Sequence, residues 1–300
     1  MKKTIKLITC LTLALLLPLA CVTSAFASGS YLTYAGYVFS LENGQANLHA
    51  YTGNENDLYI PDELWGYTVA GIDDNAFFGG SDYTALYLQY AKHLKTIGKF
   101  AFYGCSGFHN AVVPQEVETI GSGAFQSCTS LQRVTFNTEK VTVIEPQTFY
   151  QCSQLSEISL PSSVTELGDY AFAECSSLSY LELPTTVTTF GNDVFLGDSS
   201  LTLGVYFDSA AYHYAIDNGI NYRLLDGALL GDVNGDGKVN INDVTAVQCH
   251  IAEMWMLEGI LLHAADVDRN GEVEITDATA IQSFLAEYAD PYAIGEPMTT

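Results

Sequence analysis

The 300-residue chain carries 35 acidic and 11 basic side chains, so its formal net charge at pH 7 is −24. A surface this acidic repels nucleic acids and anionic membranes, and it favours cations or basic partners. The length exceeds that of one average domain, but repeat folds extend a single domain well beyond it. Composition therefore argues against nucleic-acid binding but does not determine the fold, which must be inferred from sequence repeats and motifs.

Residues 1–27 have the pattern of a secretory leader. A basic start with three lysines precedes an apolar run over 7–20, which is too short to span a bilayer comfortably. The small residues at Ala25–Ala27 predict cleavage before Ser28, and a lipoprotein leader cut before Cys21 is the alternative. Removing the leader leaves 8 basic against 35 acidic residues, a charge of −27. Since no later apolar stretch is long enough to span a membrane, we predict a secreted protein.

Residues 28–62 are predicted to form a β-hairpin cap. Two alternating segments, 31–41 and 46–51, flank the turn residues Glu42–Gln45. Such a hairpin would cover the open end of a stack of repeats, which otherwise exposes its core and its strand edges.

Residues 63–226 are predicted to form a repeat solenoid with a C-terminal cap. Segments such as IGKFAFYGC and IGSGAFQSC recur with spacings of 25, 23, 24, 23 and 23 residues between their anchor phenylalanines. The anchors are Phe77, Phe102, Phe125, Phe149, Phe172 and Phe195. A short alternating strand that ends near a proline follows the anchors. This period and pattern resemble leucine-rich repeats of the BspA (TpLRR) type over about 57–226. The resemblance implies a parallel sheet on one face and short turns or a helical turn on the other.

The interior of each coil is expected to be shared between neighbours. About 23 residues cannot enclose a core alone, so the coils must stack at the strand spacing of ~4.8 Å. Each inward position then becomes a ladder of similar side chains, and the phenylalanines at 102, 125, 149 and 172 form an aromatic spine. The inward residues of one coil are Leu155, Ile158, Leu160, Leu167, Ala171 and Phe172.

A cysteine follows four of the anchors by three residues, at Cys105, Cys128, Cys152 and Cys175. Exported proteins favour disulfides, and stacked equivalents would have Cα atoms about 4.8 Å apart, which a disulfide allows. Their parallel Cβ atoms, however, would be farther apart than a disulfide prefers. We therefore predict free, small, buried hydrophobic side chains.

The pattern changes after the sixth repeat. Ala210–Asp217 is predicted to be a helix stopped by Asn218 and Gly219, and residues 220–224 a last strand. Residues 227–230 form a short linker that predicts limited hinge motion, because it holds little Pro or Ser.

Two acidic loops follow the linker. Oxygen-bearing side chains alternate in the first loop, and a glycine stands where the chain must turn sharply. The loop recurs 34 residues later with the same offsets. A hard cation needs six to eight oxygens, and residues at alternate positions wrap them around one point. Two such loops in register predict two Ca²⁺ ions.

The paired loops and the segments 244–254 and 278–288 resemble a type I dockerin over 231–292, with 293–300 as a tail. Both loops end in Asp where the EF-hand pattern ends in Glu, and no helix of EF-hand length precedes the first. The resemblance implies a small all-α, calcium-folded module that binds a cohesin on a scaffoldin. Such scaffolds are typical of cellulosome-like complexes in polysaccharide breakdown. The protein would then be extracellular, on a cell-surface or free scaffold complex.

The resemblance also assigns roles to individual residues. Calcium would contact side chains at loop positions 1, 3, 5 and 12 and the carbonyl oxygen at position 7, whereas position 9 acts through water or not at all. The ligand positions are Asp232, Asn234, Asp236, Lys238, Asn240 and Asp243, and Asp266, Asp268, Asn270, Glu272, Glu274 and Asp277. The cohesin-binding positions are Ile241, Asn242, Gln248, Cys249 and Glu253, with counterparts Ile275, Thr276, Gln282, Ser283 and Glu287.

The Gln and Glu of this set are identical in the two copies, which predicts a two-fold related surface that binds in two orientations. The Ile-Asn and Ile-Thr pairs depart from the Ser-Thr of the best-known dockerins, so the cohesin class stays open. Helical spacing predicts a core of Val247, Ile251, Met254, Ile281, Phe284, Leu285 and Tyr288.

Catalytic motifs are missing from the sequence. The six histidines share no repeat position, and there is no Gly-rich phosphate loop, GxSxG or HExxH. We therefore predict a non-catalytic interaction protein whose outward strand positions either form a ligand face for protein or glycan or are a plain solvated surface. Those positions include Tyr87, Asn110, Arg133, Thr135, Glu157, Ser159, Tyr180 and Glu182. The alternatives are a carbohydrate-active component that takes part in polysaccharide degradation, and an adhesin or inhibitor anchored through the dockerin.

Overall fold

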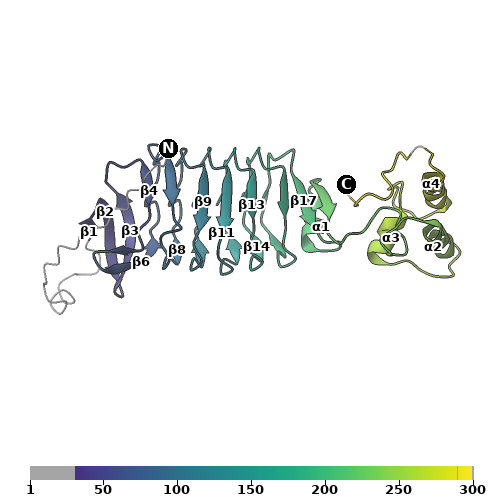
Figure 1. Cartoon of the computed structure of the whole chain (residues 1–300), viewed down its shortest axis with the longest axis horizontal. Helices are drawn as coiled ribbons and strands as arrows, with labels where there is room; N and C mark the ends of the chain where they lie inside the picture. The colour runs from purple at the N-terminus through teal and green to yellow at the C-terminus, as the bar shows by residue number, and fades with distance from the viewer. Residues whose placement is uncertain (1–30, 289, 299–300) are drawn as a thin grey trace, which may run out of the picture.

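The computed structural model of the chain describes residues 31–288 and 290–298, so the predicted leader and both of its cleavage sites lie outside the described residues. A long solenoid of stacked coils is followed by a smaller helical unit near the C-terminus (Figure 1). Among the described residues, no helix has the length and apolarity needed to cross a membrane.

The N-terminal end of the solenoid is a β-hairpin, as the alternation predicts. β2 (Tyr37–Glu42) and β3 (Gln45–Tyr51) pair antiparallel around a turn in which Asn43 and Gly44 have φ of +50° and +77°. β1 (Leu32–Tyr34) adds to the other edge of β2. The hairpin continues into the solenoid because β3 pairs parallel with β6 (Tyr67–Ile72), and β5 (Glu63–Leu64) pairs antiparallel with β6.

Each later coil contributes a longer strand to one face of the solenoid. These strands pair parallel and in register, so that Arg133, for example, lies between Asn110 and Glu157. The strands of this repeat sheet are β4 (Asp57–Tyr59), β7 (Ala85–Tyr87), β9 (Asn110–Val113), β11 (Arg133–Phe136), β13 (Glu157–Ser159), β15 (Tyr180–Glu182), β17 (Thr202–Val205) and β18 (Asn221–Leu224).

A second parallel ladder lies just before the anchor turns, where the sequence predicts only turns or a helical turn. It consists of two-residue strands, which are too short to show an alternating pattern in the sequence. They are β8 (Thr96–Ile97), β10 (Thr119–Ile120), β12 (Val143–Ile144), β14 (Glu166–Leu167) and β16 (Thr189–Phe190). The solenoid therefore has parallel strands on two sides.

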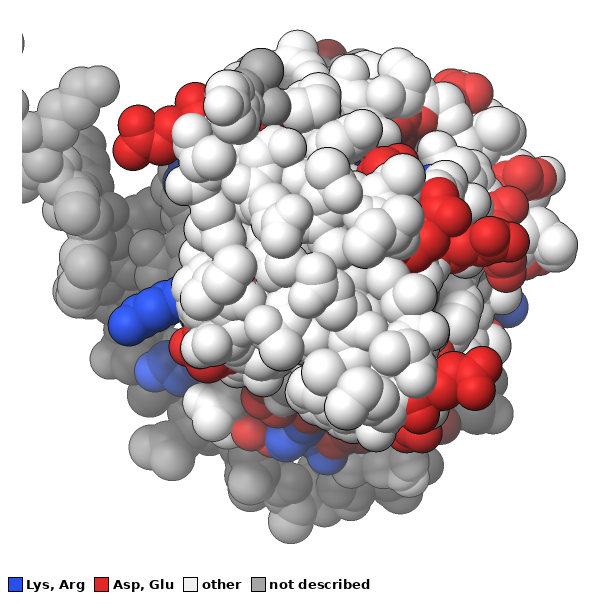
Figure 2. Space-filling model, turned by 90° about the vertical axis from the view of Figure 1, so that its right-hand side faces the viewer, with Lys and Arg blue, Asp and Glu red and all other residues white. Residues whose placement is uncertain are grey.

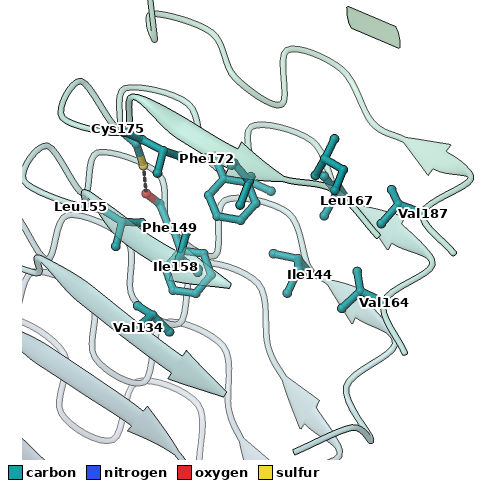
Figure 3. Packing of buried hydrophobic residues seen from close by; sticks show 14 of the residues in the cluster. Val134, Ile144, Phe149, Leu155, Ile158, Val164, Leu167, Phe172, Cys175 and Val187 are labelled. Carbon is teal, nitrogen blue, oxygen red and sulfur yellow. Dashed lines mark hydrogen bonds between the residues drawn. The ribbon is translucent and has the colours of Figure 1, made fainter. Parts of the chain in front are cut away.

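The phenylalanine spine runs through the interior, as predicted. Consecutive rings from Phe77 to Phe195 stack with centroids 5.2–5.8 Å apart, so the spine includes one ring more at each end than the four named from the sequence. Figure 3 shows Phe149 and Phe172 between the aliphatic residues of both strand ladders. Of the predicted inward residues, Leu160 is only partly buried, because it ends its coil's strand segment next to Pro161.

The four repeat cysteines are free and buried, as predicted, and the structure adds a hydrogen bond for each of them. Each thiol donates to the carbonyl oxygen of the anchor phenylalanine one coil earlier, with Sγ···O distances of 3.1–3.2 Å. Figure 3 shows this bond between Cys175 and Phe149. Burial raises the pKa of the Cys105 thiol to about 12 and raises those of the other three well above the ordinary value. The cysteines therefore link neighbouring coils as neutral donors.

This arrangement predicts how the thiols react in a chain that begins at Ser28. In the folded protein, a thiol reagent should label Cys249 within minutes and leave the repeat cysteines unmodified, because they are buried and protonated. After unfolding in guanidinium without reductant, all five described cysteines should react. Fewer reactive thiols in the unfolded sample would show that a disulfide is present.

The C-terminal end of the solenoid matches its prediction. α1 (Ala210–Asp217) begins at Ser209, whose side chain accepts a hydrogen bond from the Tyr212 N–H, and Asn218 is its C-cap. β18 then pairs parallel with β17 and completes the sheet.

The C-terminal unit contains α2 (Ile241–Ile251), α3 (Gly259–Ala265) and α4 (Ile275–Leu285), and α2 packs against α4. The sequence predicts one helix after each loop, which are α2 and α4. The structure contains α3 as a further helix that was not predicted. α3 faces the solenoid, since the His263 ring lies 5.7 Å from that of Phe207 and 6.3 Å from that of Tyr212, between centroids.

The predicted linker is held by the C-terminal tail. Leu229 forms a β-bridge with Pro297, and the Met298 carbonyl oxygen accepts from the Leu224 N–H of β18 at 3.0 Å. Leu230 both donates to Glu296 (3.0 Å) and accepts from Gly295 (2.8 Å). These contacts restrain the joint between the two units.

Candidate metal centre and partner-binding face

The first acidic loop is organised by its own carboxylates. The two carboxylate oxygens of Asp232 accept from the backbone N–H groups of Asp236 (3.1 Å) and Gly237 (2.8 Å). Asp236 accepts in turn from the Lys238 N–H at 3.0 Å. Gly237 has φ of +81°, which explains why glycine stands at this bend. The Asn234 side chain accepts from the Asp236 N–H as well, at 2.9 Å, so the side-chain oxygens at positions 1 and 3 share one backbone donor.

The second loop repeats this geometry. Asp266 accepts from the N–H groups of Asn270 (3.1 Å) and Gly271 (2.9 Å), as Asp232 does from its counterparts. Ligand atoms of Asp266, Asp268 and Asp277 all lie within 4.8 Å of one another. Burial raises the pKa of Asp277, and the negative charge of Asp268 adds to the shift. A divalent cation would remove the repulsion within this cluster, so the residues fit Ca²⁺.

Aspartate at position 12 ties each loop to the helix that follows it. Asp243 is fully buried, and one of its oxygens accepts from the N–H groups of Val233 (2.9 Å) and Asn234 (3.0 Å). Its other oxygen accepts from the Asn240 N–H at 2.7 Å. Asp277 makes the same three bonds in the second loop. The short side chain thus joins the start of the loop to the start of the helix.

The remaining predicted ligands lie where their loop positions require. Asn240 and Glu274, at position 9, are the N-caps of α2 and α4, and each takes part in a capping box. The side chains of Lys238 and Glu272 are exposed, which leaves the carbonyl oxygen as the ligand at position 7. The two loops therefore offer the same kinds of oxygen ligand at equivalent positions.

All ten predicted cohesin-binding residues lie at the surface. Ile241 and Ile275 are 60% and 59% exposed at equivalent positions, while Cys249 and Ser283 are half-buried and the others are exposed. Figure 2 views this end of the molecule: its centre is largely uncharged, and charged side chains, mostly acidic with a few basic ones, lie around it.

The ends of α2 and α4 are also equivalent. Glu253 and Glu287 have φ of +55° and +57°, and the residue after each donates to the carbonyl of Cys249 (2.9 Å) or Ser283 (3.0 Å). These are helix-terminating bonds of the Schellman type, made twice. The symmetry between the copies therefore extends from the loops to the helix ends.

The predicted core of this unit is wrong at four positions. Val247 and Ile281 are fully buried and Phe284 is partly buried, whereas Ile251, Met254, Leu285 and Tyr288 are exposed. Met254 and Tyr288 lie beyond the helix ends and leave the helical spacing on which the prediction rested, whereas Ile251 and Leu285 are the last residues of their helices. Exposed Trp255 and Met256, which follow Met254, add apolar surface that the sequence reasoning missed although three large apolar residues stand in a row.

The repeat sheet presents its predicted outward residues to solvent, and of these only Tyr87 is partly buried. Arg133 forms an ion pair with Glu157 of the next coil. Tyr59 and Tyr87 stack in register with centroids 4.3 Å apart, and Tyr90 lies 6.2 Å from Tyr59. Of these three tyrosines, the sequence predicts only Tyr87 as part of a ligand face. Tyr59 could have been found from the sequence, because it aligns with Tyr87 in successive repeats.

Stacked parallel coils followed by two loop–helix units define a class: a leucine-rich repeat protein with a small helical module built on two acidic loops. Comparison with known families makes this specific. Residues 70–202 match the BspA type leucine rich repeat region in six copies, and residues 230–286 match the dockerin type I domain. The chain therefore contains a BspA-type repeat region and a type I dockerin, both of which are non-catalytic interaction modules.

Several solved leucine-rich repeat proteins are similar to the chain. A leucine rich cell surface protein from Faecalibacterium prausnitzii is 26% identical over 59% of this chain and 55% of its own, with a TM-score of 0.47. TpLRR of T. pallidum is 21% identical over 58% of this chain and 71% of its own, with a TM-score of 0.42. A protein from Eubacterium ventriosum is 24% identical over 55% and 50%, with a TM-score of 0.40. The chain thus spans about half the length of the first of these proteins. No curated protein matches the chain.

Proposed function

We propose that this is an exported, non-catalytic interaction protein that its dockerin attaches to a cohesin in the presence of Ca²⁺. A dockerin implies a cohesin partner, and a leucine-rich repeat region implies a role in protein interaction. Proteins with these modules are typically extracellular or surface-associated, which agrees with the leader-like residues 1–27. The cohesin would belong to a scaffold on the cell surface or free in the medium.

The observation that carries the proposal is the duplicated binding surface. Two loops with the same hydrogen-bond pattern are followed by helices that expose the same Gln and Glu at equivalent positions. An uncharged centre with an acidic surround has the composition of an interface core with a polar rim. A panel of cohesins, assayed by surface plasmon resonance with Ca²⁺ and again with EGTA, tests it directly. Absence of binding to any cohesin would refute the proposal.

The two-fold arrangement predicts a specific mutational pattern. Changing Gln248 and Glu253 to Ala should weaken cohesin binding about twofold, because the second orientation remains, and changing Gln282 and Glu287 should do the same. All four changes together should weaken it on the order of 100-fold or more. Glu258→Ala is the control, since Glu258 is exposed at the start of α3 and makes no side-chain cap hydrogen bond. Complete loss of binding from one pair alone would indicate a single orientation.

The repeat sheet is proposed to be the surface that the dockerin presents on the scaffold. The Tyr59, Tyr87 and Tyr90 cluster supports a ligand role, because stacked exposed tyrosines offer flat apolar area with hydroxyl groups at its edge. Retention on xylan or cellulose would favour the carbohydrate-active alternative. Capture of a protein by the sheet, lost on changing Tyr59 and Tyr90 to Ala, would favour an adhesin or inhibitor.

A further inference from the structure

Asp198 occupies the position that a cysteine holds in four earlier coils. It follows its anchor, Phe195, by three residues, and its N–H donates to the Phe195 carbonyl oxygen at 3.2 Å. Cys175 makes the same bond with Phe172 at 3.2 Å. The backbone geometry is therefore conserved between the coils, while the thiol is replaced by a carboxylate.

The Asp198 carboxylate is buried without a partner. The residue is 9% exposed, and among the described residues neither oxygen has a hydrogen-bond partner. A thiol at this position donates to the carbonyl of the preceding coil, whereas an ionised carboxylate has no hydrogen to donate. Burial raises the pKa of Asp198 to about 7, the nearby backbone N–H of Cys175 offsets part of this shift, and the negative charge of Glu174 adds to it. The carboxylate thus lacks a side-chain donor and a positive charge among the described residues.

A cavity of about 370 Å³ opens onto Asp198 at the end of the solenoid. After the sixth repeat, α1 and the turn that follows it cover this end of the solenoid. Apolar side chains and amides alternate on the walls, which include Phe195, Tyr214, Asn218, Ile220 and Asn221. Asp193 also lines the cavity but is exposed, so the site combines one buried carboxylate with amide side chains and apolar surface.

We propose that this cavity binds an organic cation, a primary ammonium or guanidinium group on an alkyl chain. The cationic N–H groups would donate to the Asp198 carboxylate and to the amide oxygens of Asn218 and Asn221, and the chain would contact Tyr214 and Ile220. Calcium suits the site poorly because it takes six to eight oxygens, whereas one nearly buried carboxylate and half-apolar walls suit an amine. The net charge of −24 attracts such ligands. The cation is either a free amine or a Lys or Arg side chain of a partner.

Two substitutions remove the charge without leaving a hole. Asp198→Cys restores the residue of the earlier coils, whose thiol would donate to the Phe172 carbonyl as Cys175 does to that of Phe149. Asp198→Asn keeps the shape of the side chain and makes it neutral. Both variants are expected to fold, and the solenoid melting temperature of each, measured at pH 8, confirms that they do.

The test is isothermal titration of the full chain, with Ca²⁺ and in buffers without primary amines. The probes are n-butylammonium, the peptides acetyl-Gly-Lys-Gly-amide and acetyl-Gly-Arg-Gly-amide, and the neutral controls n-butanol and acetyl-Gly-Gln-Gly-amide. At least one cation should bind saturably at pH 8, tenfold or more tightly than its neutral control, and both variants should lose this binding. Preference for the peptides identifies a protein side chain as the ligand, and preference for butylammonium identifies a free amine. Absence of saturable cation binding, or equal binding by Asp198→Cys, would overturn the proposal.

The pH dependence separates Asp198 from the general acidic surface. At pH 5.5, a carboxyl group with a pKa near 7 is protonated, so cation binding should fall at least tenfold from its value at pH 8. Of the groups around it, Glu174 and Asp193 are exposed, while burial raises the pKa of Cys175 and of Tyr214, which stay neutral at both pH values. Binding that is equally tight at pH 5.5 would place the cation on ordinary surface carboxylates and would contradict the assignment. The result is independent of the dockerin and its cohesin.

Discussion

Chelation of calcium by EGTA is expected to unfold residues 231–292 while the repeat solenoid keeps its structure. The dockerin loops gather carboxylates that repel one another without a cation. Few large side chains in this unit are fully buried, chiefly Val233, Val244, Val247, Val267 and Ile281. Each bound ion adds about 2.7 kcal/mol when free calcium is 100 times its Kd. Calorimetry should therefore show a separate dockerin transition that disappears with EGTA, and limited proteolysis should then cleave within 231–292.

Substitutions in the loops provide the matched controls. Asp243→Ala with Asp277→Ala should reproduce the effect of EGTA in the presence of calcium, because both residues are buried and accept three backbone N–H groups each. Lys238→Ala with Glu272→Ala should leave calcium binding intact, since position 7 contributes its carbonyl oxygen. Cooperative loss of both units in one transition on adding EGTA would contradict the two-unit interpretation.

Phe149→Ala is expected to lower the free energy of unfolding of the solenoid by about 3–5 kcal/mol. The Phe149 ring is fully buried and stacks between Phe125 at 5.8 Å and Phe172 at 5.4 Å, between centroids. In a solenoid each coil is stabilised mainly by its neighbours, so this deletion weakens the interfaces on both sides. Urea denaturation of the calcium-loaded chain, followed at the solenoid transition, measures the change.

Phe78→Ala is the control for this experiment. Phe78 stacks on Tyr103 with centroids 4.5 Å apart, but it is 55% exposed and lies outside the spine. Its removal should cost about 1 kcal/mol or less, the value of an exposed aromatic pair. Equal losses from Phe78→Ala and Phe149→Ala would show that burial in the spine is not the source of solenoid stability.

The sequence by itself determined the repeat architecture, the paired loops and the helix at Ala210–Asp217. These features depend on local spacing: an anchor phenylalanine every 23–25 residues, oxygen side chains at alternate positions, and a cap residue before an apolar periodic segment. Local spacing predicts these features because each coil or loop makes its main contacts with its neighbours along the chain. The surface position of the ten dockerin residues was predictable for the same reason.

Only the tertiary structure decided the features that depend on where a pattern ends. Ile251, Met254, Leu285 and Tyr288 fit a helical stripe, but the helices stop and these side chains face solvent. The two-residue strands of the second ladder and the pairing of the tail with the linker carry no local signal. Asp198 looks like one more carboxylate in an acidic sequence. It becomes a candidate site because its carboxylate cannot donate to the preceding coil as a thiol does, and because a cavity at the end of the stack lies beside it.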